Sequence, residues 1–381
     1  MRVMSMTKIT RKEIAEKSKR IVVKVGSRLI ADMKESDKVD RINQLIEAIA
    51  EARNAGFEII LVSSGAIGVG MKLTGRTKRP DDLAELQALA AVGQGRLMSI
   101  YENACQKHGF HGAQILLSAD DVKDRKRHLN FCNCIYALLK NNILPIINEN
   151  DTVNVEEICF GDNDRLAALV GTMVRADLCV LLTTVNGLHE RGIDGQFTDR
   201  IPLVETLSDD IKALASGTDG NQFSTGGMQS KLDAADIVMR AGEHMIIADG
   251  SDFSVINQIL SGEDKGTLFP AISQKMLGSK RWLAFFAEAS GDIKIDSGAE
   301  NAITSKGRSL LAKGIISIDG QFKKGDTINI FSGDNKIAVG RSNYNSEELS
   351  KILGCHSKEF KEILGHNHYD EVVHRNNMVI L

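Results

Sequence analysis

Two lysines occupy positions where their charge could do chemistry. Lys24 interrupts the apolar, β-branched run VVKVGS, and Lys231 ends the glycine-rich stretch STGGMQSK, at the start of a helix-like segment. A lysine within a buried strand is rare unless it has a partner, and a flexible glycine loop can bring a lysine to an anion. The two positions therefore predict cationic groups that bind an anion and stabilise its charge.

Acidic and amide residues gather at two further points. NENDTV follows the apolar run ILPII directly, and GDND opens an amphipathic segment that begins near residue 163. GDND alone is also typical of a helix N-cap with an acidic first turn. Two such clusters at strand or helix ends favour a shared site for a cation or an ammonium group.

A fourth segment, VSSGAIGVG, places serine and glycine directly after a strand. Backbone N–H groups can approach an anion there, and a helix beginning at this point adds its positive end. Many α/β turns look similar. The motifs GxxxxGK[ST], GxGxxG, HExxH and GxSxG do not occur, which excludes a P-loop enzyme and leaves the other signatures without support. The C-terminal histidines and cysteine match no standard metal spacing, so no protein metal site is predicted.

The elements that must position these groups alternate between strand and helix patterns over the first two-thirds of the chain. Short apolar strands separated by helices favour a mainly parallel sheet covered on both faces. Ligands of such sheets bind at the carboxyl ends of the strands. We expect strands within 20–27, 113–118, 143–151, 178–184 and 244–250, a strand and a glycine-rich turn in 57–70, and helices at 39–56, 83–108, 126–141, 163–176 and 228–241.

Short strands with closely spaced turns replace this pattern in the last quarter of the chain, which predicts a small β-rich second domain. Near the N-terminus, before the first expected strand, Thr10 and Glu13 form a capping-box pattern. A short helix is therefore expected there. The predicted division is an N-terminal extension at 1–19, an α/β domain at 20–264, a linker at 265–281 and a β-rich domain at 282–381.

The composition is that of a globular protein, with 43% hydrophobic and 25% charged residues among 381. A net charge of -3 favours neither nucleic acid nor an anionic membrane, and no apolar run is long enough to span a bilayer. The basic N-terminus has no apolar core, so it does not resemble a secretory signal. Six cysteines without CxxC spacing predict a reducing, cytoplasmic location.

Taken together, the quoted segments resemble the glutamate 5-kinases of the amino-acid kinase family. VVKVGS, VSSGAIGVG, LQALAAVGQGRLM, PIINENDTV, GDNDRLAALV, STGGMQSKLDAADIVMRAG and GRSNYNSEEL occur in order from about residue 20 to the end. The resemblance implies an α/β sandwich around a mainly parallel sheet, the amino-acid-kinase fold, at 20–264. It also implies that the β-rich end is a PUA domain.

The resemblance also implies a role for each matching residue. Lys24 and Lys231 would face the phosphates, and Asp164, with Asp162 nearby, would hold the lysines in place. The family often has an aspartate where this chain has Thr184. The first 20 residues of this chain have no assigned counterpart in the family. The glutamate-binding residues would be Ser64, Asp151 and Asn163, and the ATP-binding residues Lys24, Thr183, Thr184, Thr225, Gly226, Gly227, Met228, Gln229, Ser230 and Lys231.

The implied reaction is transfer of the γ-phosphoryl group of ATP to the side-chain carboxylate of L-glutamate, the first step of proline biosynthesis. The acceptor is already ionised at neutral pH, so no general base is needed, and lysines with Mg²⁺ would offset the repulsion between anions. The resemblance further implies feedback inhibition by proline, a homo-oligomer (dimer or tetramer) and handover of the acyl phosphate to glutamate-5-phosphate reductase.

Two other functions stay open at this point. Another amino-acid kinase would share the fold and act on aspartate, carbamate, acetylglutamate or UMP. An RNA-binding regulatory protein would act through the PUA-like domain. Residues 281–381 contain equal numbers of Lys+Arg and Asp+Glu, whereas nucleic-acid-binding domains are usually basic. The charge balance therefore favours a kinase over an RNA-binding protein.

Overall fold

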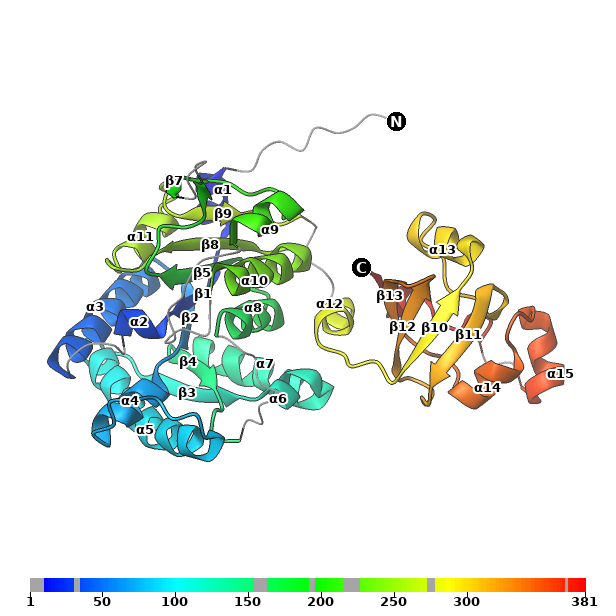
Figure 1. Cartoon of the computed structure of the whole chain (residues 1–381), viewed down its shortest axis with the longest axis horizontal. Helices are drawn as coiled ribbons and strands as arrows, with labels where there is room; N and C mark the ends of the chain where they lie inside the picture. Colours follow the sequence, from blue (N-terminus) through cyan, green and yellow to red (C-terminus); the bar gives the residue numbers. More distant parts are fainter. Residues whose placement is uncertain are drawn as a thin grey trace. The chain divides into compact units, whose positions relative to one another are not determined.

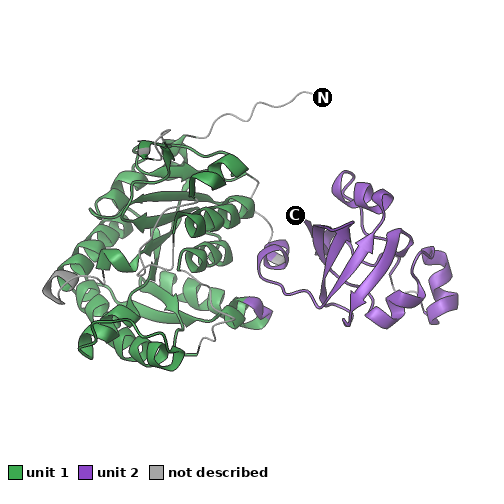
Figure 2. Ribbon diagram, viewed as in Figure 1, with its two compact units in different colours: residues 1–122, 126–275 green, residues 123–125, 276–381 purple. Residues whose placement is uncertain are grey.

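The computed structural model describes residues 10–30, 35–153, 163–191, 196–215, 227–272, 278–366 and 369–381. It divides into two compact units, shown in Figure 2. Unit 1 holds residues 1–122 and 126–275, and unit 2 holds residues 123–125 and 276–381. None of the described helices is long and apolar enough to cross a lipid bilayer.

A seven-stranded sheet forms the centre of unit 1 (Figure 1). Its strand order is β3-β4-β2-β1-β5-β8-β9, and all neighbours are parallel except β8 and β9. The prediction of a mainly parallel sheet is therefore confirmed. The strands are β1 (Arg20–Val25), β2 (Glu58–Ser63), β3 (Gly112–Leu117), β4 (Leu144–Glu149), β5 (Leu178–Thr183), β8 (His244–Asp249) and β9 (Thr267–Phe269).

Helices cover both faces of this sheet because the side chains of a strand alternate between the faces. Ile21, Val23 and Val25 join a core cluster with α3 (Glu35–Asn54), α5 (Leu83–Lys107) and α11 (Val255–Leu260). The opposite face receives α8 (Asn163–Val174), whose Gly171 lies against Cys179 and Val22. Helix α10 (Met228–Ala241) packs on α8. Lys24, two residues after Val22, belongs to this second face.

The segment after β2 differs from the predicted glycine-rich turn. Only Ser64 and Gly65 form the turn, and α4 (Ala66–Leu73) follows at once. Gly65 is the N-cap with φ +103°, a conformation that favours glycine. Gly70 inside α4 is explained by packing, because a Cβ there would lie 2.0 Å from the carbonyl oxygen of Leu89 on α5.

Apart from α7, the remaining elements of unit 1 are short. The expected helix at the N-terminus is α1 (Arg11–Lys17), with its capping box formed by Thr10 and Glu13. Strand β9 pairs with Met245–Ile247 of β8, so this part of the predicted linker lies in the sheet. The other elements are α2 (Ser27–Ile30), α6 (Ala119–Lys123), α7 (Arg125–Lys140), β6 (His189–Arg191), β7 (Phe197–Arg200) and α9 (Asp209–Ala215).

Unit 2 contains a five-stranded sheet of order β11-β10-β12-β13-β14, in which only β10 and β12 are parallel. Tyr344 and Phe360 are fully buried in its core and meet edge to face. The predicted β-rich domain is confirmed. Its elements are α12 (Gly278–Phe285), β10 (Gly291–Ile295), α13 (Ser297–Thr304), β11 (Ile315–Gly320), β12 (Thr327–Ser332), β13 (Asn335–Arg341), α14 (Ser346–Lys351), α15 (Phe360–Leu364) and β14 (Met378–Ile380).

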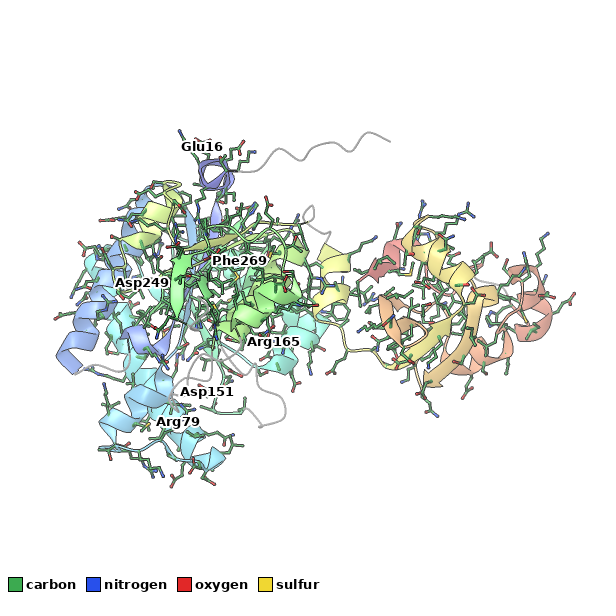
Figure 3. The ribbon with its side chains drawn as sticks, turned by 45° about the horizontal axis from the view of Figure 1, so that its top comes forward. Glu16, Arg79, Asp151, Arg165, Asp249 and Phe269 are labelled. Atoms are coloured by element: carbon green, nitrogen blue, oxygen red, sulfur yellow. The ribbon has the colours of Figure 1, made fainter. Side chains whose placement is uncertain are left out.

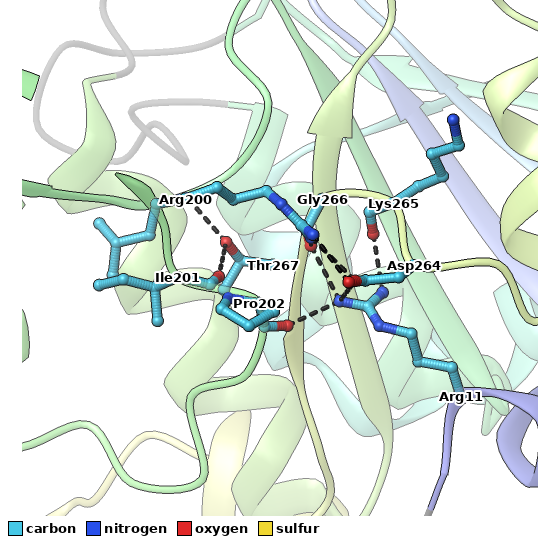
Figure 4. Close-up of polar contacts among 9 residues, drawn as sticks. Arg11, Arg200, Ile201, Pro202, Asp264, Lys265, Gly266 and Thr267 are labelled. Atoms are coloured by element: carbon cyan, nitrogen blue, oxygen red, sulfur yellow. Dashed lines mark hydrogen bonds and ion pairs between the residues drawn. The ribbon is translucent and has the colours of Figure 1, made fainter. Parts of the chain in front are cut away.

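Arg11 connects α1 to the edge of the sheet through hydrogen bonds, as Figure 4 shows. Its guanidinium donates to the carbonyl oxygens of Lys265 at 2.7 Å, Pro202 at 2.6 Å and Gly266 at 2.9 Å. It also pairs with Asp264 at 3.1 Å. One side chain thus binds the carbonyl groups of Lys265 and Gly266, which lead into β9, and that of Pro202 in a separate segment.

We expect Arg11→Met to destabilise unit 1 by about 1–3 kcal/mol, because three carbonyl oxygens lose a charged donor. The free energy of unfolding in urea measures the change. Lys17→Met is the matched control, since Lys17 is exposed on the same helix, and it should change stability by less than about 0.5 kcal/mol. Equal effects of the two substitutions would show that Arg11 does not anchor α1.

Candidate active site

Two lysines from different elements meet on one carboxylate. Lys24 is the fifth residue of β1, Asp164 lies in the first turn of α8, and Lys231 lies in the first turn of α10. Asp164 Oδ1 accepts a hydrogen bond from Lys24 Nζ, and Oδ2 accepts one from Lys231 Nζ at 2.9 Å. The structure thus brings together the two lysines that the sequence singled out.

This group is buried and carries a net charge of one positive unit. Lys24 is 5% exposed, Lys231 is 7% exposed and Asp164 is fully buried. Burial acts to raise the pKa of Asp164, but the two lysines outweigh it and hold the pKa well below the usual range of an aspartate. Ser230 adds a hydrogen bond from its Oγ to Asp164 Oδ2 at 3.2 Å. Asp164 is therefore ionised beside the two lysines.

A second polar cluster lies beside this one and is built from amides. Asn163, next to Asp164, donates from Nδ2 to Ser64 Oγ at 2.5 Å, to the Ser63 carbonyl oxygen at 3.1 Å and to Asn148 Oδ1 at 3.0 Å. Ser64 and Asn163 were predicted to lie in one pocket, and they are in contact. The Oδ1 of Asn163 is buried and has no hydrogen-bond partner among the described residues.

Asp151 lies on the turn after β4 (Figure 3). The pKa of this carboxyl is raised to about 6, mainly by burial and also by the nearby charge of Glu149, while Arg79 acts to lower it. The group therefore titrates close to neutral pH. A positive ligand beside Asp151 would favour its ionised form.

The predicted nucleotide residues lie at the ends of β5 and at the start of α10. The carbonyl oxygen of Thr183 accepts from the Gly250 N–H at 2.8 Å, and Thr184 is exposed. Gly227 is the N-cap of α10, followed by Met228, the exposed Gln229 and Ser230. Three predicted residues lie outside the described part of the chain: Asp162, Thr225 and Gly226.

Several polar residues beside the site were not assigned a role from the sequence. Asn148 is the first polar residue of NEND, and it donates to Gln94 Oε1 at 3.0 Å. Ser63 Oγ and Tyr101 Oη are 2.8 Å apart in the buried core. The polar segment NEND could have indicated Asn148. Gln94 lies in a helical pattern, and nothing in that pattern indicates its contact with Asn148.

Comparison with known proteins agrees with this arrangement. The model of the amino acid kinase family matches residues 19–249, and that of the PUA domain matches residues 291–364. The chain belongs to the amino acid kinase family. The resemblance seen in the sequence and the predicted second domain are both confirmed.

Curated relatives within this kinase family cover almost the whole chain. The glutamate 5-kinase of Caldanaerobacter subterraneus subsp. tengcongensis is 43% identical over 365 residues, which is 95% of this chain and 98% of that protein. The glutamate 5-kinase of Syntrophus aciditrophicus is 39% identical over 373 residues, 97% of this chain and 96% of that protein. Desulfotalea psychrophila has a glutamate 5-kinase that is 42% identical over 374 residues, 97% of this chain and 99% of that protein.

Asp164→Asn should destabilise this kinase by about 3–5 kcal/mol, because it leaves two buried lysines without a compensating charge. Urea unfolding of the full chain measures the effect. The double variant Asp164→Asn/Lys231→Met should be less destabilised than the single variant, since one of the uncompensated cations is gone.

Asp236→Asn serves as the control for this prediction. Asp236 pairs with Arg240 at 3.3 Å on α10, with both side chains more than 40% exposed, and an exposed pair contributes less than about 1 kcal/mol. A cost of Asp164→Asn no larger than that of Asp236→Asn would contradict the proposed charge balance.

Proposed function

We propose that this kinase transfers the γ-phosphoryl group of ATP to the side-chain carboxylate of L-glutamate, giving L-glutamate 5-phosphate. The observation that carries the proposal is the convergence of Lys24 and Lys231 on Asp164, next to an amide cluster that holds an acceptor without a partner among the described residues. Curated relatives that span this chain are glutamate 5-kinases. Residues 20–264 would perform the reaction.

The two lysines would supply the main stabilisation of the transferred group. The acceptor carboxylate is already ionised at neutral pH, so the reaction needs no base, and the difficulty is repulsion between two anions. Lys24 is fixed on a central strand, and Lys231 is fixed at a helix start. Both would donate to oxygens of the transferring phosphoryl group, where negative charge gathers in the transition state. Asp164 keeps the two cations together before ATP arrives.

The amide cluster would bind the amino-acid end of glutamate. Asn163 Oδ1 and the carboxylate of Asp151 are acceptors suited to an ammonium group. The first N–H groups of α4, after Ser64 and Gly65, have no partner within the helix and suit a carboxylate. The substrate would thus be held by complementary charges at its α-carbon, leaving its side chain to reach the phosphate.

Mg²⁺ would enter this site as part of the nucleotide substrate. Both oxygens of Asp164 are engaged by lysines, and no group of three or more His, Cys, Asp or Glu side chains among the described residues could hold a metal. This donor set fits an ion carried by phosphate oxygens and water, which is how Mg²⁺ is commonly bound with nucleotides. The ion would reduce the negative charge of the phosphates.

ATP itself would lie across the ends of β5 and α10. Thr183 ends β5 and Thr184 follows it directly, and the helix start at Gly227 offers N–H groups to a phosphate. Thr225, Gly226, Met228, Gln229 and Ser230 would complete this site, and Asp162 would assist Asp164.

Further parts of the proposal rest on the resemblance to glutamate 5-kinases alone. They are feedback inhibition by proline, a homo-oligomer (dimer or tetramer), and handover of the acyl phosphate to glutamate-5-phosphate reductase. The proposal also includes a cytoplasmic location, which rests instead on the free thiols of the described cysteines.

The reaction is tested by ADP release in the presence of L-glutamate, ATP and Mg²⁺, with hydroxylamine to trap the acyl phosphate. We expect ADP release that depends on L-glutamate and an equal amount of γ-glutamyl hydroxamate. Lys231→Met should lower kcat by a factor on the order of 10²–10³, because one contact to the transition state is lost. Preference for aspartate, carbamate, acetylglutamate or UMP, or ADP release without hydroxamate, would reject the proposal.

Glutamate binding should weaken at acid pH because Asp151 must be ionised to hold the ammonium group. The pKa of this carboxyl is raised to about 6, so protonation removes its charge as the pH falls below that value. The kcat/KM for glutamate should then fall by about tenfold per pH unit, while the KM for ATP changes little.

Asp151→Asn gives the control for this pH profile. The variant should have a low kcat/KM for glutamate and no longer show the acid limb, since no titrating group remains at this position. An unchanged acid limb in Asp151→Asn would assign it to another residue.

A further inference from the structure

Gln94 is a buried polar residue that the proposed mechanism leaves without a role. It lies on α5 within the segment VGQG and is only 8% exposed. The position of Gln94 depends on its neighbour Gly93. A Cβ on Gly93 would lie 1.8 Å from the carbonyl oxygen of Ala66, so α5 crosses α4 at the closest approach that a glycine permits. This crossing fixes Gln94 beside the end of β4.

The side-chain oxygen of Gln94 accepts a hydrogen bond from Asn148 Nδ2 at 3.0 Å. On its other side, Asn148 Oδ1 accepts from the Glu149 N–H at 2.9 Å and from Asn163 Nδ2 at 3.0 Å. Every contact of Asn148 therefore agrees with one orientation of its amide. Turning the amide over would bring donors against donors and leave Gln94 Oε1 facing an oxygen.

The hydrogen bond to Asn148 also favours one orientation of the Asn163 amide. Its Nδ2 faces three acceptors, from Ser63, Ser64 and Asn148. Its Oδ1 must then point the other way, where it is buried and has no partner among the residues that the structure describes. A buried acceptor without a donor is costly, so a ligand that donates hydrogen bonds fits this position.

We propose that Gln94 is a positioning residue for the amino group of the acceptor substrate. Its oxygen fixes the amide of Asn148, which fixes the amide of Asn163, and Asn163 Oδ1 is thereby aimed at the substrate ammonium. The identity of that substrate as L-glutamate rests on the proposed function. Gln94 itself does not touch the substrate.

The variant Gln94→Met tests this role, because methionine has a similar volume and lacks the acceptor oxygen. Asn148 then loses one of the contacts that select its orientation, and its hydrogen bond to Asn163 holds the amide of Asn163 less firmly. The KM for L-glutamate should rise roughly 10–100-fold, the range of a misplaced hydrogen bond to a charged group. The kcat and the KM for ATP should change by less than about threefold.

Rescue and epistasis separate this role from a structural one. Gln94→Glu keeps an acceptor oxygen and should keep the glutamate KM within a few-fold of the wild type. The double variant Gln94→Met/Asn163→Ala should have the same glutamate KM as Asn163→Ala alone, because Gln94 acts through Asn163. Additive effects in the double variant would overturn the proposal.

Leu97→Ala provides the control for loss of packing, since Leu97 is buried on the same helix. It should lower the melting temperature without selectively raising the glutamate KM. If Gln94→Met does not fold, Gln94→Ala takes its place, because it removes the acceptor oxygen without adding volume. A wild-type glutamate KM in a folded variant would reject the role of Gln94 and leave the proposed kinase reaction intact, whereas absence of hydroxamate with the wild-type enzyme would reject the reaction itself.

Discussion

The site depends on one buried carboxylate that binds two lysines. An isolated lysine in a protein interior loses its charge or destabilises the fold, because desolvation disfavours the ammonium form. Asp164 removes this difficulty for Lys24 and Lys231 together, since each of its oxygens accepts from one of them. Because one carboxylate faces two lysines, the group has a net positive charge. It therefore attracts a polyphosphate while the empty site stays stable.

The fold is what makes this meeting possible. Lys24 lies on β1 at the middle of the sheet, on the face that α8 covers, and α10 packs against α8. The first turns of the two helices consequently approach the carboxyl end of the central strand. In parallel sheets the chain leaves each strand at this edge, so residues far apart in sequence gather there. The separation of 140 positions between Lys24 and Asp164 is spanned by ordinary strand–helix units.

Sequence patterns predicted the elements well where periodicity was strong, and they singled out candidate site residues where the residue type was unusual. Lys24 stood out because its strand is otherwise apolar, and Asn163 because it opens a helix. A helix beginning after VSSG was expected, but a glycine-rich turn was predicted as far as residue 70. Glycines usually mark turns, whereas Gly70 lies inside α4 and is required by the close crossing with α5. Gln94 was also missed. Its importance lies in a contact with Asn148 on a different element, and no local pattern encodes such a contact.

The two halves of the site differ in how fully their polar groups are satisfied. In the cationic half the charges are paired within the protein, so nucleotide binding rearranges existing contacts. The amide half leaves Asn163 Oδ1 buried without a donor among the described residues, at a cost of roughly 1–3 kcal/mol. An ammonium group at this position would recover that free energy on binding. A molecule of the same length without an amino group would leave the acceptor unsatisfied, so the proposed orientation of one amide would favour an amino acid.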